Sequence, residues 1–277
     1  MLLPFLKMHG AANDFVVVDH RLPFLDEPLS GLVARLCDRR RGVGADGVLL
    51  LDSDPELDFT MRYFNSDGGA ADYCGNGARC LARLALDLGL GRGGEVRFRT
   101  AVGVQSARRN GDRIEVRFGR VAAPERRERV AAAGREFSGW FVRPGVPHFV
   151  IETASLADVP LAEWGGSLRR SAVWGSEGAN VDFCELRGPD RIGMRTFERG
   201  VEGETLACGS GALATALARA AAGAESPVRI ETAGGDTLTV RWRRDGAEFE
   251  VWLEGPVEVA FSGQWTVNAA TAAPTPQ

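Results

Sequence analysis

A five-residue motif that occurs twice constrains this chain more than any other feature. "CGNGA" begins at Cys74 and "CGSGA" begins at Cys208, which lies 134 residues further on. If one half of the chain is a copy of the other, further segments should match at about the same offset. Three do so in the same order: "NDFVVVD" from Asn13 with "PHFVIET" from Pro147, Asp46 with Asn180, and, at an offset one residue shorter, "RYFN" from Arg62 with "RTFE" from Arg195. The sequence therefore predicts two homologous halves.

The two halves also show the same order of predicted elements. Each has a β-rich opening, a strand after a glycine turn, a strand that ends in a polar loop, and a helix that begins at the CGxGA motif. Antiparallel-looking strands follow each helix, with hairpin turn signals at "NGD" and "RDGA". The helices after Gly77 and Gly211 are apolar on nearly all sides, which is typical of buried helices. We expect an α+β fold of two pseudo-symmetric lobes rather than alternating βαβ units.

The repeat sets the expected domain limits. Residues 1–120 are predicted to form an N-terminal lobe and residues 121–262 a C-terminal lobe, with a linker near "GRVAAPERRERVAAAG". Residues 263–277 are expected to form a tail whose start packs back on the N-terminal lobe. The last residues of this tail, "NAATAAPTPQ", have the composition of a frayed end.

Composition excludes several classes of protein. The balance of 33 basic and 37 acidic residues gives a net charge of −4, which offers no electrostatic footprint for nucleic acid or an anionic membrane. No apolar run approaches the roughly 18 residues of a membrane helix, and the amino terminus is too short in its apolar part for a secretory signal, so we expect a cytoplasmic protein. An odd count of five cysteines favours free thiols over a disulfide framework. Cys37, Cys80 and Cys184 are expected to be core residues.

Residues 42–47, "GVGADG", match the GxGxxG fingerprint of dinucleotide-binding proteins. That fingerprint needs a strand before it and a helix after it. Here a predicted helix, "LSGLVARLCDRR", comes first and a predicted strand, "VLLLD", follows. We therefore do not expect a nucleotide site at this motif.

The CGxGA motif places a thiol at the start of a helix. Unpaired backbone N–H groups and the positive end of the helix dipole face whatever lies in front of such a residue. The glycines allow close approach of a carboxylate or phosphate, and the same field lowers the pKa of a thiol at this position. Duplication could bring both anion cradles to one ligand, with one sulfur on each side. Inversion at an α-carbon needs such an arrangement, because one group removes the proton and another returns one to the opposite face.

The sequence offers poor binding sites for pyridoxal phosphate or a zinc ion, the groups that could otherwise assist this chemistry. Pyridoxal phosphate requires a lysine for its Schiff base, and Lys7 is the only lysine in the chain. His9, His20 and His148 have no zinc-site spacing to one another or to the cysteines. We therefore expect neither a cofactor nor a metal.

Six stretches of the chain together resemble the diaminopimelate epimerase family. They are "KMHGAANDFVVVD", "RGVGADG", "YFNSDGGAADYCGNGARC", "GVPH", "GANVDF" and "RTFERGVEGETLACGSGA". The resemblance covers nearly the whole chain, and it implies two lobes of strands wrapped around a central helix that close on the substrate. It also implies cofactor-independent conversion of LL- to meso-diaminopimelate, for lysine and cell-wall synthesis, by an isomerase that is usually a homodimer.

The resemblance further implies roles for individual residues. Cys74 and Cys208 would be the two bases, one a thiolate and the other a thiol, with His148 assisting the first and Glu198 the second. The reacting carboxylate of the amino acid substrate would be cradled by Gly75, Asn76, Gly209 and Ser210. The non-reacting L-centre would be held by Asn13, Asn65, Asn180 and Arg199, with the Arg199 guanidinium as a fork on its carboxylate.

Two departures from the family pattern keep other functions open. Val146 stands where many members have asparagine before the Pro-His pair, and the loop that carries Glu202 and Glu204 is one residue longer than the family spacing. One alternative is a racemase or isomerase of the same fold that acts on another amino acid or carboxylate. A second is a non-catalytic amino-acid-binding or redox-sensing protein, although a sensor needs no duplicated anion cradle.

Overall fold

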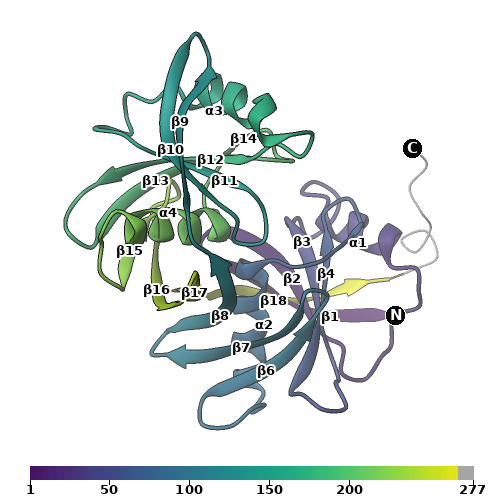
Figure 1. Ribbon diagram of the computed structural model, residues 1–277. Coiled ribbons are helices and arrows are strands. Elements are labelled where there is room, and N and C mark those ends of the chain that lie inside the picture. The colour runs from purple at the N-terminus through teal and green to yellow at the C-terminus, as the bar shows by residue number, and fades with distance from the viewer. Residues whose placement is uncertain (268–277) are drawn as a thin grey trace. The chain divides into compact units, whose positions relative to one another are not determined.

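The computed structural model describes residues 1–267 and divides into two compact units (Figure 1). Unit 1 consists of Met1–Arg117 together with the described residues from Gly255 onward. Unit 2 is Phe118–Glu254. Each unit contains one of the two CGxGA motifs, so each is built around one copy of the repeat.

Unit 1 is a sheet wrapped around one helix. Its elements are β1 (Leu2–Gly10), β2 (Asn13–Asp19), α1 (Ser30–Cys37), β3 (Gly47–Asp52), β4 (Phe59–Asn65), β5 (Ala70–Ala71), α2 (Gly75–Asp87), β6 (Glu95–Thr100), β7 (Gly103–Asn110), β8 (Arg113–Ala122), which runs on into unit 2, and β18 (Glu258–Thr266). The strands pair in the order β18, β1, β2, β3, β4, β6, β7 and β8, with β5 beside β4. Helix α2 contacts six of these strands, so it is the central helix of the unit (Figure 1).

Unit 2 repeats this arrangement. Its elements are β9 (Glu125–Ala132), β10 (Arg135–Val142), β11 (His148–Glu152), α3 (Leu161–Arg169), the 3₁₀ helix η1 (Ala172–Trp174), β12 (Asn180–Leu186), β13 (Arg191–Glu198), β14 (Gly203–Thr205), α4 (Gly209–Ala221), β15 (Val228–Glu231), β16 (Thr237–Asp245) and β17 (Glu248–Pro256). The strands pair in the order β9, β10, β11, β12, β13, β15, β16 and β17, with β14 beside β13. Helix α4 is the central helix here.

Strand register confirms the duplication. Phe15 of β2 pairs with Gly47 of the parallel strand β3, and Phe149 of β11 pairs with Val181 of the parallel strand β12. Both members of the second pair lie 134 residues after their counterparts, the same offset as the two cysteines. The predicted α+β fold of two homologous lobes is therefore confirmed.

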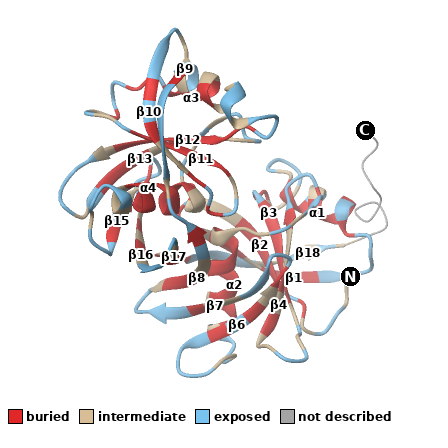
Figure 2. Cartoon of the chain, viewed as in Figure 1, coloured by how far each residue is buried: buried red, intermediate tan, exposed pale blue. Residues whose placement is uncertain are grey.

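The apolar runs of the sequence reflect burial on both faces of the sheet. In β2, Phe15 packs in the cluster around α2, whereas Val16 packs in the cluster around α1. In β3, Leu49 and Leu50 divide in the same way. A strand that is covered on both sides reads as a continuous hydrophobic run. Figure 2 shows burial in the central helices as well, since most residues of α2 and α4 are buried.

The structure differs from the expected boundaries at two places. Residues 119–134, expected as a linker, hold the end of β8 and strand β9, which pairs with β10. The side chains of β9 are mostly exposed, so the strand is made by backbone hydrogen bonds that composition does not reveal. Residues 255–262, expected in the C-terminal lobe, belong to unit 1 because β18 pairs with β1. The expected frayed end from Asn268 onward lies outside the described residues.

The helix and strand order around "GVGADG" is as predicted. Helix α1 ends at Cys37 before the motif, and strand β3 begins at Gly47 within it. The glycine-rich segment thus connects a helix to a strand, the reverse of the order in a dinucleotide site.

Candidate active site

Each of the two predicted bases is the N-cap residue of a central helix. Cys74 and Cys208 have extended backbone conformations, with φ of −142° and −124°. The Sγ atom of Cys74 accepts a hydrogen bond from the N–H of Gly77 at 3.5 Å, and that of Cys208 accepts one from the N–H of Gly211 at 3.4 Å. Both sulfurs therefore lie at the positive end of a helix dipole, where a thiolate is favoured.

In unit 1 the Cys74 thiol belongs to a hydrogen-bonded group of three predicted site residues. Its Sγ atom lies 3.7 Å from Asn13 Oδ1, to which it donates when protonated, and the Asn76 amide donates to the same oxygen at 3.1 Å. The Asn13 amide nitrogen in turn donates to Asp46 Oδ2 at 2.7 Å. These contacts fix the orientation of the Asn13 amide beside the thiol.

The remaining predicted residues of unit 1 lie at the start of α2 and at the end of β4. Gly75 is the first residue of α2, directly after the N-cap. Asn65 is the last residue of β4, where it pairs with Gly47, and its side chain is exposed. The exposed position of Asn65 leaves its amide accessible to a small molecule.

In unit 2 a buried chain of hydrogen bonds runs from a carboxylate to the Cys208 thiol. Asp182 Oδ2 lies 2.7 Å from His148 Nδ1, and neither side chain has any exposed surface. His148 Nε2 lies 3.0 Å from Ser210 Oγ, which in turn lies 3.5 Å from Cys208 Sγ. Thr196 donates to the other carboxylate oxygen of Asp182 at 2.6 Å.

The partners of His148 determine which ring nitrogen carries the proton. Asn180 Oδ1 accepts from the backbone N–H of Arg199 at 2.7 Å, so its amide nitrogen is the atom that faces His148 Nε2 at 3.2 Å. An amide nitrogen can only donate and an ionised carboxylate can only accept. His148 therefore holds its proton on Nδ1, donates to Asp182, and uses Nε2 as the acceptor for the Ser210 hydroxyl. The oxygen of Ser210 is then free to accept from the Cys208 thiol.

The family pattern pairs His148 with the first cysteine. In the structure its hydrogen bonds are made within unit 2, to Asp182, Ser210 and Asn180. This places His148 two hydrogen bonds from Cys208.

Burial dominates the acid–base properties of the unit 2 half-site. It raises the pKa of the Cys208 thiol well above the usual value, and the negative charges of Glu198 and Asp182 raise it further. The backbone N–H of Gly211, which donates to the sulfur, opposes the rise, as does the contact with Ser210. Burial also raises the pKa of Glu198, against a hydrogen bond from Thr205 at 2.8 Å. Cys208 is thus held as a thiol.

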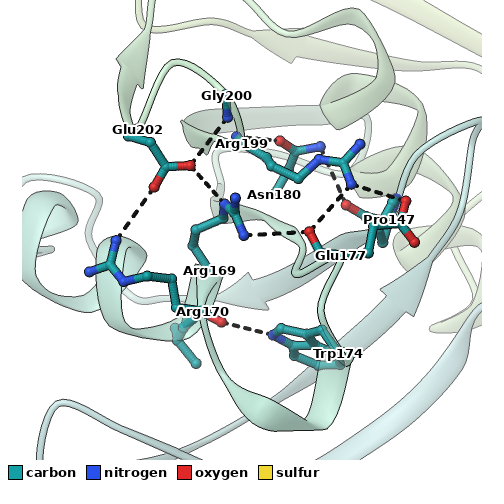
Figure 3. A network of polar contacts seen from close by, with 10 residues as sticks. Pro147, Arg169, Arg170, Trp174, Glu177, Asn180, Arg199, Gly200 and Glu202 are labelled. Carbon is teal, nitrogen blue, oxygen red and sulfur yellow. Dashed lines mark hydrogen bonds and ion pairs between the residues drawn. The ribbon is translucent and has the colours of Figure 1, made fainter.

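Arg199, the predicted carboxylate fork, is already bound to a carboxylate (Figure 3). Its Nη1 atom lies 3.0 Å from Glu177 Oε1, and Arg143 Nη1 lies 3.1 Å from the other oxygen of Glu177. These two guanidinium groups hold the pKa of Glu177 below its ordinary value. The pair of arginines can therefore bind a carboxylate at this position.

The longer loop after Arg199 places its two glutamates away from that pair of arginines. Glu202 pairs with Arg169 at 3.0 Å and with Arg170 at 3.4 Å (Figure 3). Glu204 forms a bidentate ion pair with Arg195, whose Nε and Nη2 atoms donate to the two carboxylate oxygens at 2.7 and 2.8 Å. Glu202 itself has a φ of +56°, in the left-handed region.

Asp182 is a polar residue of the site that the sequence analysis did not single out. It lies in the middle of β12, in "NVDFCEL", between strand residues that are buried. A carboxylate at an otherwise apolar strand position was the available signal, because a buried charge requires partners. Thr196 carried no comparable signal, since threonine is an ordinary strand residue.

Comparison with known proteins gives the family. The family model described as "Diaminopimelate epimerase" matches residues 5–123 and 140–260. The chain belongs to the diaminopimelate epimerase family. Membership makes it an isomerase of the epimerase class, which acts on a small molecule. The two matched segments contain both cysteine motifs and all other predicted site residues.

Individual relatives agree with this assignment. The chain is 38% identical to a diaminopimelate epimerase of Aquifex aeolicus over 275 residues, which cover 95% of this chain and 97% of that protein. It is 39% identical to one of a Synechococcus species over 282 residues, which cover 94% and 97%. Among solved structures, a PhzF-family phenazine biosynthesis protein of Bacillus anthracis superposes with a TM-score of 0.74 at 14% identity, covering 96% of this chain and all of that one. A hydroxyproline epimerase from Agrobacterium vitis superposes with a TM-score of 0.71 at 16% identity, covering 95% and 92%. These structures show the shared fold.

The described residues also bear on metal binding and on membranes. Among residues 1–267, no cluster of three or more histidine, cysteine or acidic side chains is arranged to hold a metal ion. The helices in that part of the chain are too short or too polar to cross a membrane.

Proposed function

We propose that this protein interconverts LL- and meso-2,6-diaminopimelate without a cofactor, in lysine and peptidoglycan synthesis. The observation that carries the proposal is the pair of matched half-sites. In each unit a thiol caps the central helix and accepts a hydrogen bond from a backbone N–H of that helix. Racemisation by two bases needs two such groups, one for each face of the α-carbon.

The proposed reaction moves one proton at each face. Cys74 as a thiolate removes the α-proton of one epimer, and Cys208 as a thiol delivers a proton to the opposite face. In the reverse direction the two sulfurs exchange roles. Negative charge that moves onto the substrate carboxylate would be stabilised by the helix starts, at Gly75 and Asn76 in unit 1 and at Gly209 and Ser210 in unit 2.

Two further groups would assist the sulfurs. Glu198, whose pKa is raised by burial, lies close enough to Cys208 to affect its pKa. His148 reaches Cys208 through Ser210, and its imidazolium form would be compensated by Asp182. We assign both residues to proton exchange with the thiols.

The rest of the substrate would be held by polar groups of both units. Asn13, Asn65 and Asn180 supply amides for the non-reacting L-centre. Arg199 would bind the distal carboxylate, and support comes from Glu177, a carboxylate that already occupies its guanidinium group. We further propose a cytoplasmic homodimer that engages neither nucleic acid nor membrane.

The first experiment is proton NMR of the reduced protein with LL-diaminopimelate in D2O. We expect loss of one α-proton signal together with formation of the meso product. L-Histidine, L-glutamate and L-proline in parallel should show no exchange. Exchange in one of these instead, with diaminopimelate inert, would keep the two-cysteine chemistry and reassign the substrate. Val146 makes this outcome worth testing, because its side chain offers no amide to a distal carboxylate of the substrate. Exchange in none of them would refute the proposal.

Substitution of Arg199 tests the distal carboxylate. Because a hydrogen bond between charged groups contributes about 1.5–3 kcal/mol, Arg199→Gln should raise KM for LL-diaminopimelate by roughly 10- to 100-fold. Steady-state kinetics measure this, with Arg187→Gln as a control, since Arg187 binds Glu231 at 2.8 Å at another place in unit 2. An unchanged KM in Arg199→Gln would favour a substrate without a distal carboxylate.

A further inference from the structure

Arg79 is a buried charge that the proposed mechanism does not use. It lies in α2, five residues after Cys74, and none of its surface is exposed. Its Nη2 atom donates to Asn76 Oδ1 at 2.9 Å. Its Nε and Nη1 atoms have no hydrogen-bond partner among the described residues. A guanidinium in such a place needs a counter-charge, because an unpaired buried ion is costly.

Arginine cannot meet this requirement by losing its proton. Burial lowers the pKa of the Arg79 guanidinium, but the ordinary value of about 12.5 or more leaves the group charged near neutral pH. Three groups that can become negative favour its charged form: Cys80, Cys74 and Tyr73. One of them must therefore supply the negative charge.

Two of these three groups are held neutral. Burial raises the pKa of Cys80 to about 12, although the Arg79 charge opposes the rise. Burial also raises the pKa of the Tyr73 phenol far above neutral pH. Cys74 differs from both, because its sulfur caps the start of a helix and accepts a hydrogen bond from a backbone N–H there. It is the member of the set that can hold a negative charge.

Hydrogen bonds also connect Arg79 to Cys74. Arg79 donates to the oxygen of the Asn76 amide, and the nitrogen of that amide donates to Asn13 Oδ1. Asn13 Oδ1 is the oxygen that faces Cys74 Sγ at 3.7 Å. Because the Asn76 amide cannot flip without breaking a contact, Arg79 fixes its orientation. The Cys74 thiol donates only a long, weak hydrogen bond to Asn13 Oδ1, so its ionisation gives up little, whereas the charge of Arg79 favours the thiolate.

The two repeats differ in charge at the matching positions. The residue 134 positions after Arg79 is Leu213, which is fully buried in α4. Around Cys208 the neighbouring ionisable groups are instead carboxylates, the buried Asp182 and the partly buried Glu198, and their negative charges raise the pKa of that thiol. The charged group that influences the sulfur is thus the cation Arg79 in unit 1, whereas in unit 2 it is the acidic pair Asp182 and Glu198.

We propose that Arg79 is the fixed counter-charge that keeps Cys74 as a thiolate in the substrate-free protein, while Cys208 rests as a thiol. This rests on the proposed function, since it says which cysteine is the base at rest. Diaminopimelate epimerisation needs one sulfur in each state, and the charge difference between the units sets that state before substrate arrives.

Other charged groups near the Cys74 half-site do not replace Arg79. Asn13 contacts Asp46, which pairs with Arg39, and Arg39 also pairs with Asp14 at 2.7 Å. Lys7 binds the same Asp14 at 2.6 Å. Burial raises the pKa of Asp14, but Arg39 and Lys7 outweigh this and bring it to about 2. This group pairs two acidic residues with two basic ones, so it offers no excess positive charge that could replace Arg79. Arg113 acts against the charge of Arg79 and adds to the need for an anion.

The test is the pH dependence of alkylation at each cysteine. Iodoacetamide reacts with thiolates, and mass spectrometry of the peptides gives separate rates for Cys74 and Cys208 in the same sample. We expect the Cys74 rate to reach half its maximum below pH 8.5, the ordinary thiol value, and to do so at least about one pH unit higher in Arg79→Leu. The Cys208 profile should not change.

Three variants separate charge from packing. Arg79→Leu copies the residue of the second repeat, Arg79→Gln keeps a donor for Asn76 without the charge, and Arg79→Lys keeps the charge. We expect Arg79→Lys to leave the pH profile of Cys74 alkylation unchanged. Arg79→Gln should shift this profile to higher pH, as Arg79→Leu does. If circular dichroism shows that Arg79→Leu does not fold, the comparison of Arg79→Lys with Arg79→Gln tests the proposal. A Cys74 midpoint that is the same in Gln, Lys and the natural protein would overturn the proposal. Since alkylation uses no substrate, its result is independent of whether diaminopimelate is turned over.

Discussion

Replacing either cap cysteine with serine should lower the rate of epimerisation by about 10²–10⁴-fold, the usual contribution of a positioned acid or base. A serine hydroxyl is a much weaker acid than a thiol, so neither Cys74→Ser nor Cys208→Ser can exchange the proton at its face of the α-carbon. Steady-state conversion of LL- to meso-diaminopimelate, followed in both variants, gives the loss. A variant of either residue with near-full activity would contradict the two-thiol mechanism.

The folded state should survive both substitutions. Serine is among the best N-cap residues, and its oxygen can accept the hydrogen bond that Gly77 or Gly211 now donates to sulfur. Thermal unfolding by circular dichroism should therefore show little change. Cys37→Ala is the matched control for cysteine chemistry, since Cys37 is buried in α1 and burial raises its pKa to about 12. It should leave the rate unchanged.

The two serine variants should also differ from each other in D2O. In Cys208→Ser the Cys74 sulfur can still remove an α-proton and return deuterium to the same face, so one epimer should exchange without inversion. In Cys74→Ser the other epimer should do so. Complementary exchange of this kind assigns each sulfur to one face of the α-carbon, whereas exchange of the same epimer in both variants would not fit two opposed bases.

The repeat made most of the fold predictable. Because segments along the whole chain match at one offset, the duplicated motif predicts how the entire chain is organised. The strand pairs Phe15 with Gly47 and Phe149 with Val181 are related by that same offset in the structure. The N-cap positions of Cys74 and Cys208 follow from local chemistry, because a helix start after cysteine and glycine needs no distant partner.

What sequence reasoning missed depends on contacts between distant residues. Strand β18 completes the sheet of unit 1 by pairing with β1, and Thr266 lies opposite Leu2 across almost the full length of the chain. Strand β9 exposes most of its side chains, so no hydrophobic pattern marked it. Arg79 could not be separated by type from the many surface arginines, since its burial comes from the strands that surround α2.

Asp182 is a positioning residue of the site that lies outside the motifs by which the site was predicted. Its carboxylate fixes the proton of His148 on Nδ1 and leaves Nε2 to accept from Ser210. Asp182→Asn should lower kcat by about 10²-fold or more, because an amide can no longer compensate an imidazolium and can also favour the wrong tautomer. Thr196→Val, which removes one hydrogen bond to Asp182 but keeps the charge, should cost much less.

Two readouts distinguish this positioning role from a loss of packing. The chain has three histidines, so ¹⁵N NMR can resolve the ring nitrogens of His148 with His9 and His20 as references. We expect a protonated Nδ1 in the natural protein, and in Asp182→Asn a loss of this preference for the Nδ1 proton, since the carboxylate that accepts it is gone. In a double-mutant cycle, Asp182→Asn should add little to the loss caused by His148→Gln. An equal loss in both backgrounds would mean that Asp182 acts on the fold rather than through His148, and the hydrogen-bond chain to Cys208 would then have no role in moving its proton.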